Sequence, residues 1–269
     1  MNNKITPEEI RKMSYVELMA FLGEINRPPG GKDSIRQLVQ NCFITKESSV
    51  LDVGCNTGYC TFEVAHLVKC RVVGVDISPA MIETAREFQK PDPLGKLVEF
   101  KVADGMKLPF ADGIFDVVFS GGSTAFIDDK ERAIREYKRV LKSWGFVADI
   151  NFFYKKQAPK GLISELNNLM KINIQQWDEN YWLDIYEKCG LEKYFVYKNS
   201  VKTTTAEEIK KYCSIMTDNL TIPEQARSAL LKRLVPIMTL FSENNKYLNY
   251  GVFIYRKRPI EEQISLFDA

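Results

Sequence analysis

The chain has 269 residues, of which 45% are hydrophobic and 27% charged, and its formal net charge is +2. This composition excludes disordered, collagen-like and coiled-coil proteins, and the small net charge gives no general attraction to nucleic acid or membranes. No apolar segment approaches the roughly 18 residues of a membrane span, and the length suits one large α/β domain with added elements.

Six cysteines and one histidine limit the chemistry that the chain can perform. No two cysteines have CxxC spacing and the first residues do not resemble a secretory signal, so reduced thiols in the cytoplasm are expected. A single histidine argues against a multi-histidine metal site, and no metal ligands are predicted. His66 falls within a predicted helix, where a packing or surface position is expected.

The first 45 residues are predicted to be mainly helical. Residues 6–21 form one or two helices, and Thr6 followed by Glu9 has the spacing of a capping box. Two prolines and two glycines at residues 28–31 interrupt regular structure before a helix at residues 33–41. We expect residues 1–45 to act as a helical lid.

Apolar runs alternate with amphipathic helices between residues 48 and 153. The apolar runs cover residues 49–54, 71–76, 97–102, 115–120 and 146–151. The helices between them cover residues 58–69, 79–89 and 130–142. Apolar residues fill both faces of each run, which is typical of buried parallel strands. The alternation predicts an α/β fold with a doubly wound, mostly parallel sheet.

The last third of the chain adds helices and two further strands. Helices are expected at residues 159–175 and 179–189, and strands at 191–201 and 249–256. About 45 residues separate these strands, far more than a hairpin needs. The helices at 206–216 and 223–241 therefore form an inserted cap at about 204–245, within a domain spanning 46–269 that ends in a tail at 259–269.

A glycine-rich turn follows the first predicted strand. Asp52 lies on the strand, and Gly54, Asn56 and Gly58 then lead into a helix. Glycine permits positive φ angles and close approach of backbone N–H groups to a ligand, and asparagine tolerates the left-handed region better than most residues. By itself this turn is also compatible with a purely structural connection.

Acidic or small residues also end the next three strands. The second strand ends at Asp76, where a carboxylate can accept both hydroxyls of a ribose. Asp104 follows the third strand and can accept from an adenine amino group, and Ser120 ends the fourth before two glycines. Doubly wound sheets bind ligands at this edge, so the four strand ends predict a nucleoside site.

Two ligand classes fit such a site, dinucleotides and S-adenosylmethionine (SAM). The dinucleotide pattern GxGxxG needs a third glycine, but this chain has Thr61 there. The Asp52 carboxylate would repel a pyrophosphate, whereas it suits the ammonium of the methionine part of SAM. SAM is therefore favoured.

Residues 49–153 resemble a class I SAM-dependent methyltransferase of the methyltransferase type 11 kind. The resemblance rests on the segments LDVGCNTG, VVGVDIS, ADGMKLPFADGIFDVVFS and REYKRVLKSWG. It implies a seven-stranded, Rossmann-like sheet in the order 3-2-1-4-5-7-6, with strand 7 antiparallel. The chain departs from the family at Asn56, where the family usually has glycine.

The resemblance also implies which residues bind SAM and its product S-adenosylhomocysteine (SAH). The cofactor-binding residues would be Asp52, Gly54, Asn56, Gly58, Asp76, Ile77, Asp104, Gly105 and Ser120.

Four other polar residues are candidates for substrate binding. Arg27 stands beside the Pro-Pro-Gly-Gly segment and can clamp a carboxylate or phosphate, and Asn151, Tyr154 and Tyr181 can present polar groups. Ordinary positions in the core, at the rim or in a connecting turn are the alternative for each. No catalytic base is assigned, because methyl transfer from a sulfonium needs one only when the nucleophile is protonated.

Three functions remain open from the sequence. A methyltransferase acting on a small molecule is favoured, because the lid and the inserted cap can enclose a pocket. A macromolecular substrate is the first alternative, although residues 120–124, SGGST, lack the (D/N/S)PP(Y/F) motif of amino-methylating DNA enzymes. The second is a non-catalytic SAM-binding protein.

The C-terminal tail contains a possible docking motif. Its residues 263–267, QISLF, resemble the short peptide with which bacterial proteins dock on the sliding clamp. A tail that packs on its own domain, or is frayed, is the alternative.

Overall fold

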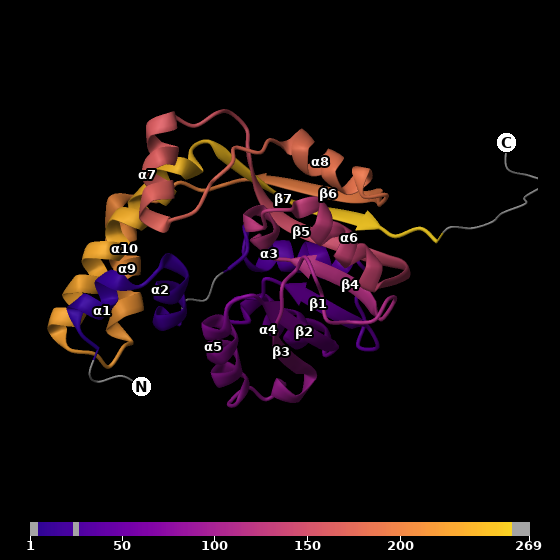
Figure 1. Ribbon diagram of the computed structural model, residues 1–269, viewed down its shortest axis with the longest axis horizontal. Coiled ribbons are helices and arrows are strands. Elements are labelled where there is room, and N and C mark those ends of the chain that lie inside the picture. The colour runs from indigo at the N-terminus through magenta and orange to yellow at the C-terminus, as the bar shows by residue number, and fades with distance from the viewer. Residues whose placement is uncertain (1–4, 24–26, 260–269) are drawn as a thin grey trace, which may run out of the picture.

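A seven-stranded sheet forms the centre of the computed structural model, which describes residues 5–23 and 27–259 (Figure 1). The strands are β1 (Ser49–Val53), β2 (Arg71–Asp76), β3 (Val98–Val102), β4 (Phe115–Ser120), β5 (Leu141–Tyr154), β6 (Glu192–Ser200) and β7 (Leu248–Arg256). Their order is β3-β2-β1-β4-β5-β7-β6, which confirms the order predicted from the sequence. Strands β1 to β5 are parallel, and β7 runs antiparallel to both β5 and β6.

Helices cover both faces of the sheet. One face packs against α3 (Lys32–Asn41), α4 (Tyr59–Val68) and α5 (Pro79–Gln89). The opposite face packs against α6 (Lys130–Val140) and α8 (Glu179–Lys188). A short 3₁₀ turn, η1 (Gly95–Leu97), precedes β3.

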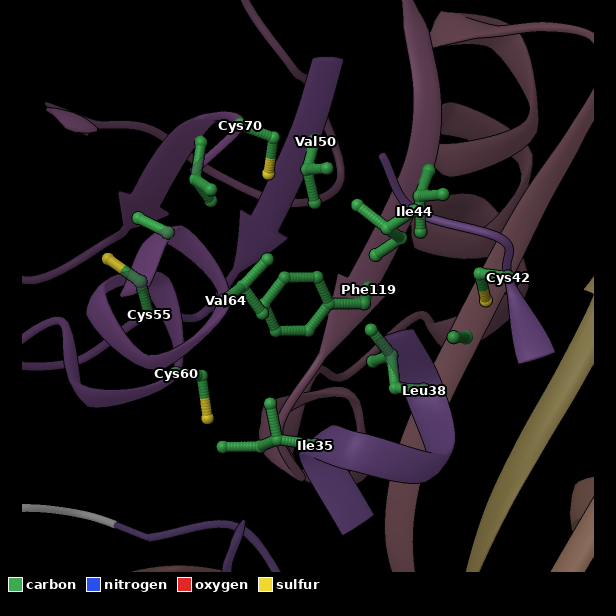
Figure 2. Close-up of a cluster of buried hydrophobic side chains, with 14 of the residues drawn as sticks. Ile35, Leu38, Cys42, Ile44, Val50, Cys55, Cys60, Val64, Cys70 and Phe119 are labelled. Atoms are coloured by element: carbon green, nitrogen blue, oxygen red, sulfur yellow. The ribbon is translucent and has the colours of Figure 1, made fainter. Parts of the chain in front are cut away.

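The strand sequences explain this layered arrangement. On β1, Val50 and Leu51 are both 0% exposed although their side chains belong to cores on opposite faces. Figure 2 shows the ring of Phe119 from β4 enclosed by Val64 of α4 and Leu38 of α3. The central strands are therefore held by apolar burial on both sides.

A separate hydrophobic core, away from the two faces of the sheet, joins helices from the two ends of the chain. It lies between α1 (Pro7–Lys12), α2 (Tyr15–Leu22), α9 (Ala206–Asp218) and α10 (Glu224–Asn245), which gather at the left of Figure 1. Ile10, Leu18, Leu230 and Leu234 are each 0% exposed in this core. The predicted capping box is present, since the Thr6 hydroxyl accepts from the Glu9 backbone N–H. Helix α7 (Lys160–Met170) contacts α10.

Two predicted boundaries differ from the structure by five residues. Strand β5 begins at Leu141 rather than at residue 146, because Leu141 already pairs with Phe115 before the register of this pairing shifts. Helix α7 ends at Met170 rather than near residue 175, because Lys171 takes a left-handed conformation with φ +55°.

The sequence analysis also considered a membrane span and a docking motif in the C-terminal tail. Within the described residues, no helix is long and apolar enough to cross a membrane. The proposed docking motif at residues 263–267 lies outside the described residues.

The replacement Arg233→Met tests the link between the two ends of the chain. In the wild-type protein, the guanidinium Nη1 of Arg233 donates to the carbonyl oxygens of Ile10, at 2.5 Å, and Met13, at 2.9 Å. Losing these bonds is expected to lower the free energy of unfolding by about 1.5–3 kcal/mol, measured by urea denaturation. The exposed neighbour Lys232→Met is the matched control, with an expected change below about 0.5 kcal/mol. Equal losses in both variants would contradict this role of Arg233.

Candidate functional site

The turn after β1 has the unusual backbone that its sequence predicts. Gly54, Asn56 and Gly58 have φ angles of +72°, +50° and +91°. The backbone N–H groups of Gly54 and Cys55 both donate to the carbonyl oxygen of Val75, at 2.8 and 2.9 Å. The turn is thereby held against the end of β2, and α4 begins directly after it.

Gly54 is required by close packing as well as by its φ angle. A Cβ at Gly54 would lie 2.1 Å from the Cβ of Ser123 in η2 (Ser123–Phe126), which follows β4. The Ser123 hydroxyl donates to the Gly54 carbonyl oxygen at 2.7 Å, and the Asn56 side-chain amide donates to the same oxygen at 3.0 Å. These contacts join the turn after β1 to the segment after β4.

Asp76 connects the turn to the start of α5. Its Oδ2 accepts from the backbone N–H of Asn56 at 3.0 Å, and its Oδ1 accepts from that of Ser78 at 2.9 Å. Burial raises the pKa of Asp76, and these two N–H donors oppose the shift. Each carboxylate oxygen can accept a further bond, so Asp76 remains able to bind a ligand. Ile77 beside it is 68% exposed.

Asp52 is a buried carboxylate beneath the turn. It is 1% exposed, and its Oδ2 accepts from the Thr61 hydroxyl at 2.7 Å. Its Oδ1 has no hydrogen-bond partner among the described residues. Burial raises the pKa of Asp52 to about 7, while the Thr61 hydroxyl opposes the shift and the Asp76 charge adds to it. A buried, unpaired carboxylate oxygen is costly unless a ligand donates to it.

The ends of β3 and β4 complete this edge of the sheet. The half-buried Asp104 accepts from the backbone N–H of Met106 at 2.8 Å, and Gly105 follows it. The Ser120 hydroxyl accepts from the N–H groups of Ser123 and Thr124, at 3.1 and 3.2 Å, and so starts η2. Because β3, β2, β1 and β4 are adjacent and parallel, their carboxyl ends, where the cofactor-binding predictions fall, lie along one edge.

The four candidates for substrate binding occupy different surroundings. Arg27 is exposed, with its guanidinium 5.8 Å from the centroid of the Tyr59 ring. Asn151 is 0% exposed, and neither atom of its amide has a hydrogen-bond partner among the described residues. The Tyr154 hydroxyl bonds to the amide of Asn244, and Tyr181 stacks on Trp177 with 3.8 Å between ring centroids. Tyr154 therefore already has a partner within the protein.

The sequence analysis missed a buried carboxylate on β5. Asp149 is 0% exposed, and its Oδ2 accepts a short hydrogen bond from the hydroxyl of Tyr186, which is also 0% exposed. Its Oδ1 makes no hydrogen bond with a described residue. Burial raises the pKa of Asp149 to about 6. A charged residue in an otherwise apolar strand, two positions before Asn151, was the signal in the sequence.

Several other polar residues lie on the surface or cap helices. His66 is on the exposed surface, with its Nε2 2.9 Å from Asp92. Asp129 is the N-cap of α6, and its side chain accepts from the Arg132 backbone N–H. Asp128 and Tyr181 line a surface groove of about 370 Å³ between the start of α6 and α8. Among the described residues, no group of three or more His, Cys, Asp or Glu side chains is arranged to hold a metal ion.

Comparisons with known proteins connect this geometry to a family. Residues 51–148 match the model of the methyltransferase domain. The 2-methyl-6-phytyl-1,4-hydroquinone methyltransferase of Synechocystis is 32% identical over 168 residues, which cover 58% of this chain and 51% of the relative. For most of the similar curated relatives, the aligned region covers about half of their length or less.

Solved structures share the fold over most of the chain. The crystal structure of the MccD protein has a TM-score of 0.74 and 25% identity, covering 87% of this chain and all of the other. A Streptomyces coelicolor geranyl diphosphate C-methyltransferase, solved with S-adenosyl-L-homocysteine, has a TM-score of 0.63. Its identity is 16%, and the match covers 84% of this chain and 76% of that structure, so it supports the fold alone.

The replacement Gly54→Ala tests the packing of the turn. An alanine at φ +72° and 2.1 Å from Ser123 is expected to lower the free energy of unfolding by about 2–4 kcal/mol. Gly161→Ala in α7 is the matched control, because a Cβ there meets nothing within 4 Å, and it should leave stability equal or slightly higher. Urea denaturation of both variants measures the difference. A Gly54→Ala protein as stable as the control would refute the argument.

Proposed function

We propose that this chain, whose residues 51–148 are a class I SAM-dependent methyltransferase domain, transfers the methyl group of SAM to a small-molecule acceptor. The observation that carries the proposal is the buried carboxylate of Asp52, which keeps one unpaired oxygen beneath the glycine turn. An ammonium group is the donor that such an oxygen needs, and the methionine part of SAM has one.

Asp76 supports the nucleoside half of the cofactor site. Two backbone N–H groups fix its carboxylate, and each oxygen keeps capacity for a ribose hydroxyl. Under this proposal Ile77, Asp104 and Gly105 lie along the adenine, and Ser120 forms the inner wall. Gly54, Asn56 and Gly58 join Asp52 around the methionine and ribose part.

The bound cofactor supplies an activated methyl group on a sulfonium. The protein must then hold the acceptor atom in line with the carbon–sulfur bond and exclude water, because proximity and orientation supply much of the rate. The sulfur leaves with the bonding electrons, and SAH is the product. None of the nine cofactor-binding candidates is assigned as a base.

The surroundings of the site favour a small acceptor. Pro28 and Pro29 are buried, and a Cβ at Gly121 or Gly122 would lie 3.5 Å from one of these prolines. The N-terminal segment therefore packs directly over the end of β4. We propose that residues 1–45 act as a lid and that the inserted helices at about 204–245 close the same side.

Relatives with small-molecule substrates support this choice. The Synechocystis protein is named for a hydroquinone, and a Halorhodospira halochloris relative is named a sarcosine/dimethylglycine N-methyltransferase. A macromolecular acceptor and a non-catalytic SAM-binding role are the alternatives that the following experiment separates.

Methyl-labelled SAM, the purified protein and an extract of the host cell test the proposal. After incubation the products are separated by size, and label is expected in the low-mass fraction. Label in the macromolecular fraction that nuclease or protease releases would favour the first alternative. SAM binding in a control titration without transfer to either fraction would favour the non-catalytic role.

The replacement Asp76→Ala tests the nucleoside half of the site. It is expected to weaken SAM binding by about 1–3 kcal/mol, because hydrogen bonds to the ribose are lost. Isothermal titration calorimetry measures the affinity. The exposed Glu83→Ala in α5 removes the same charge without a ligand contact and should bind SAM normally. Unchanged affinity in Asp76→Ala would remove this residue from the site.

The affinity for SAM is expected to depend on pH through Asp52. With a pKa raised to about 7, its carboxyl is mainly protonated and neutral at pH 6, so affinity falls as pH decreases. Allowing also for deprotonation of the SAM amine, with a pKa of about 7.7, binding should be about fivefold weaker at pH 6 than at pH 7.5. Calorimetric titrations at both pH values measure this ratio. Asp52→Asn should abolish the weakening, and a variant that keeps it would contradict this assignment.

A further inference from the structure

Asp149 and Asn151 lie at the carboxyl edge of the sheet, beside the proposed cofactor site. They alternate along β5, so both side chains point to the face covered by α6 and α8. Asp149 pairs in register with Ser120 of β4. Beyond this pair the segment after β4 stays close to β5, since a Cβ at Gly122 would lie 3.3 Å from the Ile150 carbonyl oxygen. The two polar side chains are thus neighbours of the segment that follows β4.

Three polar atoms of these two residues lack hydrogen bonds within the described chain. They are Oδ1 of Asp149 and both Nδ2 and Oδ1 of Asn151, and both residues are 0% exposed. Tyr186 supplies the hydrogen bond to the other carboxylate oxygen of Asp149. Buried polar groups are almost always paired, so three unpaired atoms on adjacent inward positions indicate a place for a ligand group or water.

The groups around Asp149 give its charge no partner. Besides Tyr186 of α8, the side chains of Thr124 of η2 and Asn151 of its own strand approach the carboxylate and lower its pKa, and Tyr137 of α6 lies nearby. Each of these is neutral. Among the ion pairs of the described residues, Asp149 has none with a Lys, Arg or His. A cationic or N–H-donating ligand is therefore the one that this carboxylate favours.

Aromatic side chains lie next to the same part of β5. The indole N–H of Trp182 donates to the carbonyl oxygen of Phe152 at 3.2 Å. The Trp177 carbonyl oxygen accepts from the backbone N–H of Tyr154 at 2.8 Å, and Tyr181 contacts both tryptophan rings. Aromatic faces attract organic cations, and the Nζ of Lys130 already lies over the Trp177 ring, 5.6 Å from its centroid, so these rings suit the organic part of an amine.

We infer that Asp149 and Asn151 bind the amino group of the methyl acceptor, and that the acceptor class is small organic amines. The Asp149 Oδ1 and the Asn151 amide oxygen accept from the ammonium, while Trp177, Tyr181 and Trp182 flank its organic part. Acceptors that present only a carboxylate or phosphate here meet repulsion from Asp149. This inference rests on the proposed function, since it names the substrate class of the same site.

A pair of probes that differ in charge but not in shape tests the inference. Benzylammonium and benzyl alcohol are titrated into the wild-type protein saturated with SAH, and binding is measured by calorimetry or ligand-observed NMR. Benzylammonium is expected to bind at least about tenfold more tightly than the alcohol, because only the charged group makes charge-assisted hydrogen bonds to the carboxylate. Equal affinities, or no binding of either probe, would overturn the inference and leave a buried water as the partner of these atoms.

Variants then test whether the preference for benzylammonium over benzyl alcohol arises at Asp149 and Asn151. Asp149→Asn should reduce the ratio of the two affinities to about one, whereas Glu83→Gln, which changes an exposed acidic residue of α5, should keep it. Asn151→Leu, which leaves the Tyr186–Asp149 bond in place, should lower the ratio and covers the case that Asp149→Asn does not fold. A ratio that persists in both site variants would refute the assignment.

The binding of SAH separates this inference from the proposed function. If SAH fails to bind the wild-type protein, the proposed function fails. If SAH binds equally to the wild type and Asp149→Asn but the charge preference is missing from the wild type, only the amine site fails.

Discussion

The convergence of parallel strands at one edge is the constraint on which the candidate site depends. Strands β3, β2, β1, β4 and β5 point the same way, so their polar carboxyl ends meet although they are far apart in sequence. Among the described residues, the buried side-chain atoms without hydrogen bonds belong to Asp52, Tyr59, Asp149 and Asn151. Asp52 lies near the end of β1 and Tyr59 begins α4 after the glycine turn, whereas Asp149 and Asn151 lie on β5 beside the end of β4. The cost of burying them is concentrated where a ligand can offset it.

Much of the central sheet could be predicted from the sequence because its signals are local. Apolar runs with both faces buried predicted the five parallel strands, and the bounds of β2 and β4 were correct. The positive φ angles at Gly54, Asn56 and Gly58 agree with residue types that permit them. The strand order came from the family resemblance and is confirmed. The ligand contacts of the nine cofactor-binding candidates remain predictions.

Contacts between distant segments could not be read from the sequence. Arg233 of α10 bonds to carbonyl groups of residues at the other end of the chain, and no local pattern indicates this pairing. The early start of β5 at Leu141 depends on its partner Phe115. Asp149 was missed because a carboxylate in an apolar run gains meaning only when the fold places Tyr186 and Asn151 beside it. Tertiary context decided each case.

Hydrogen exchange with and without SAH tests most directly the claim that this edge of the sheet binds the cofactor. Saturating SAH is expected to slow exchange in peptides covering residues 52–60 and 74–80, because ligand contacts rigidify the turn and the loop fixed by Asp76. Peptides covering residues 66–72, which lead into the amino end of β2 at the opposite edge of the sheet, should exchange at unchanged rates and provide the internal control. Unchanged exchange across residues 52–60 and 74–80 at saturating SAH, or protection confined to residues 66–72, would contradict the account.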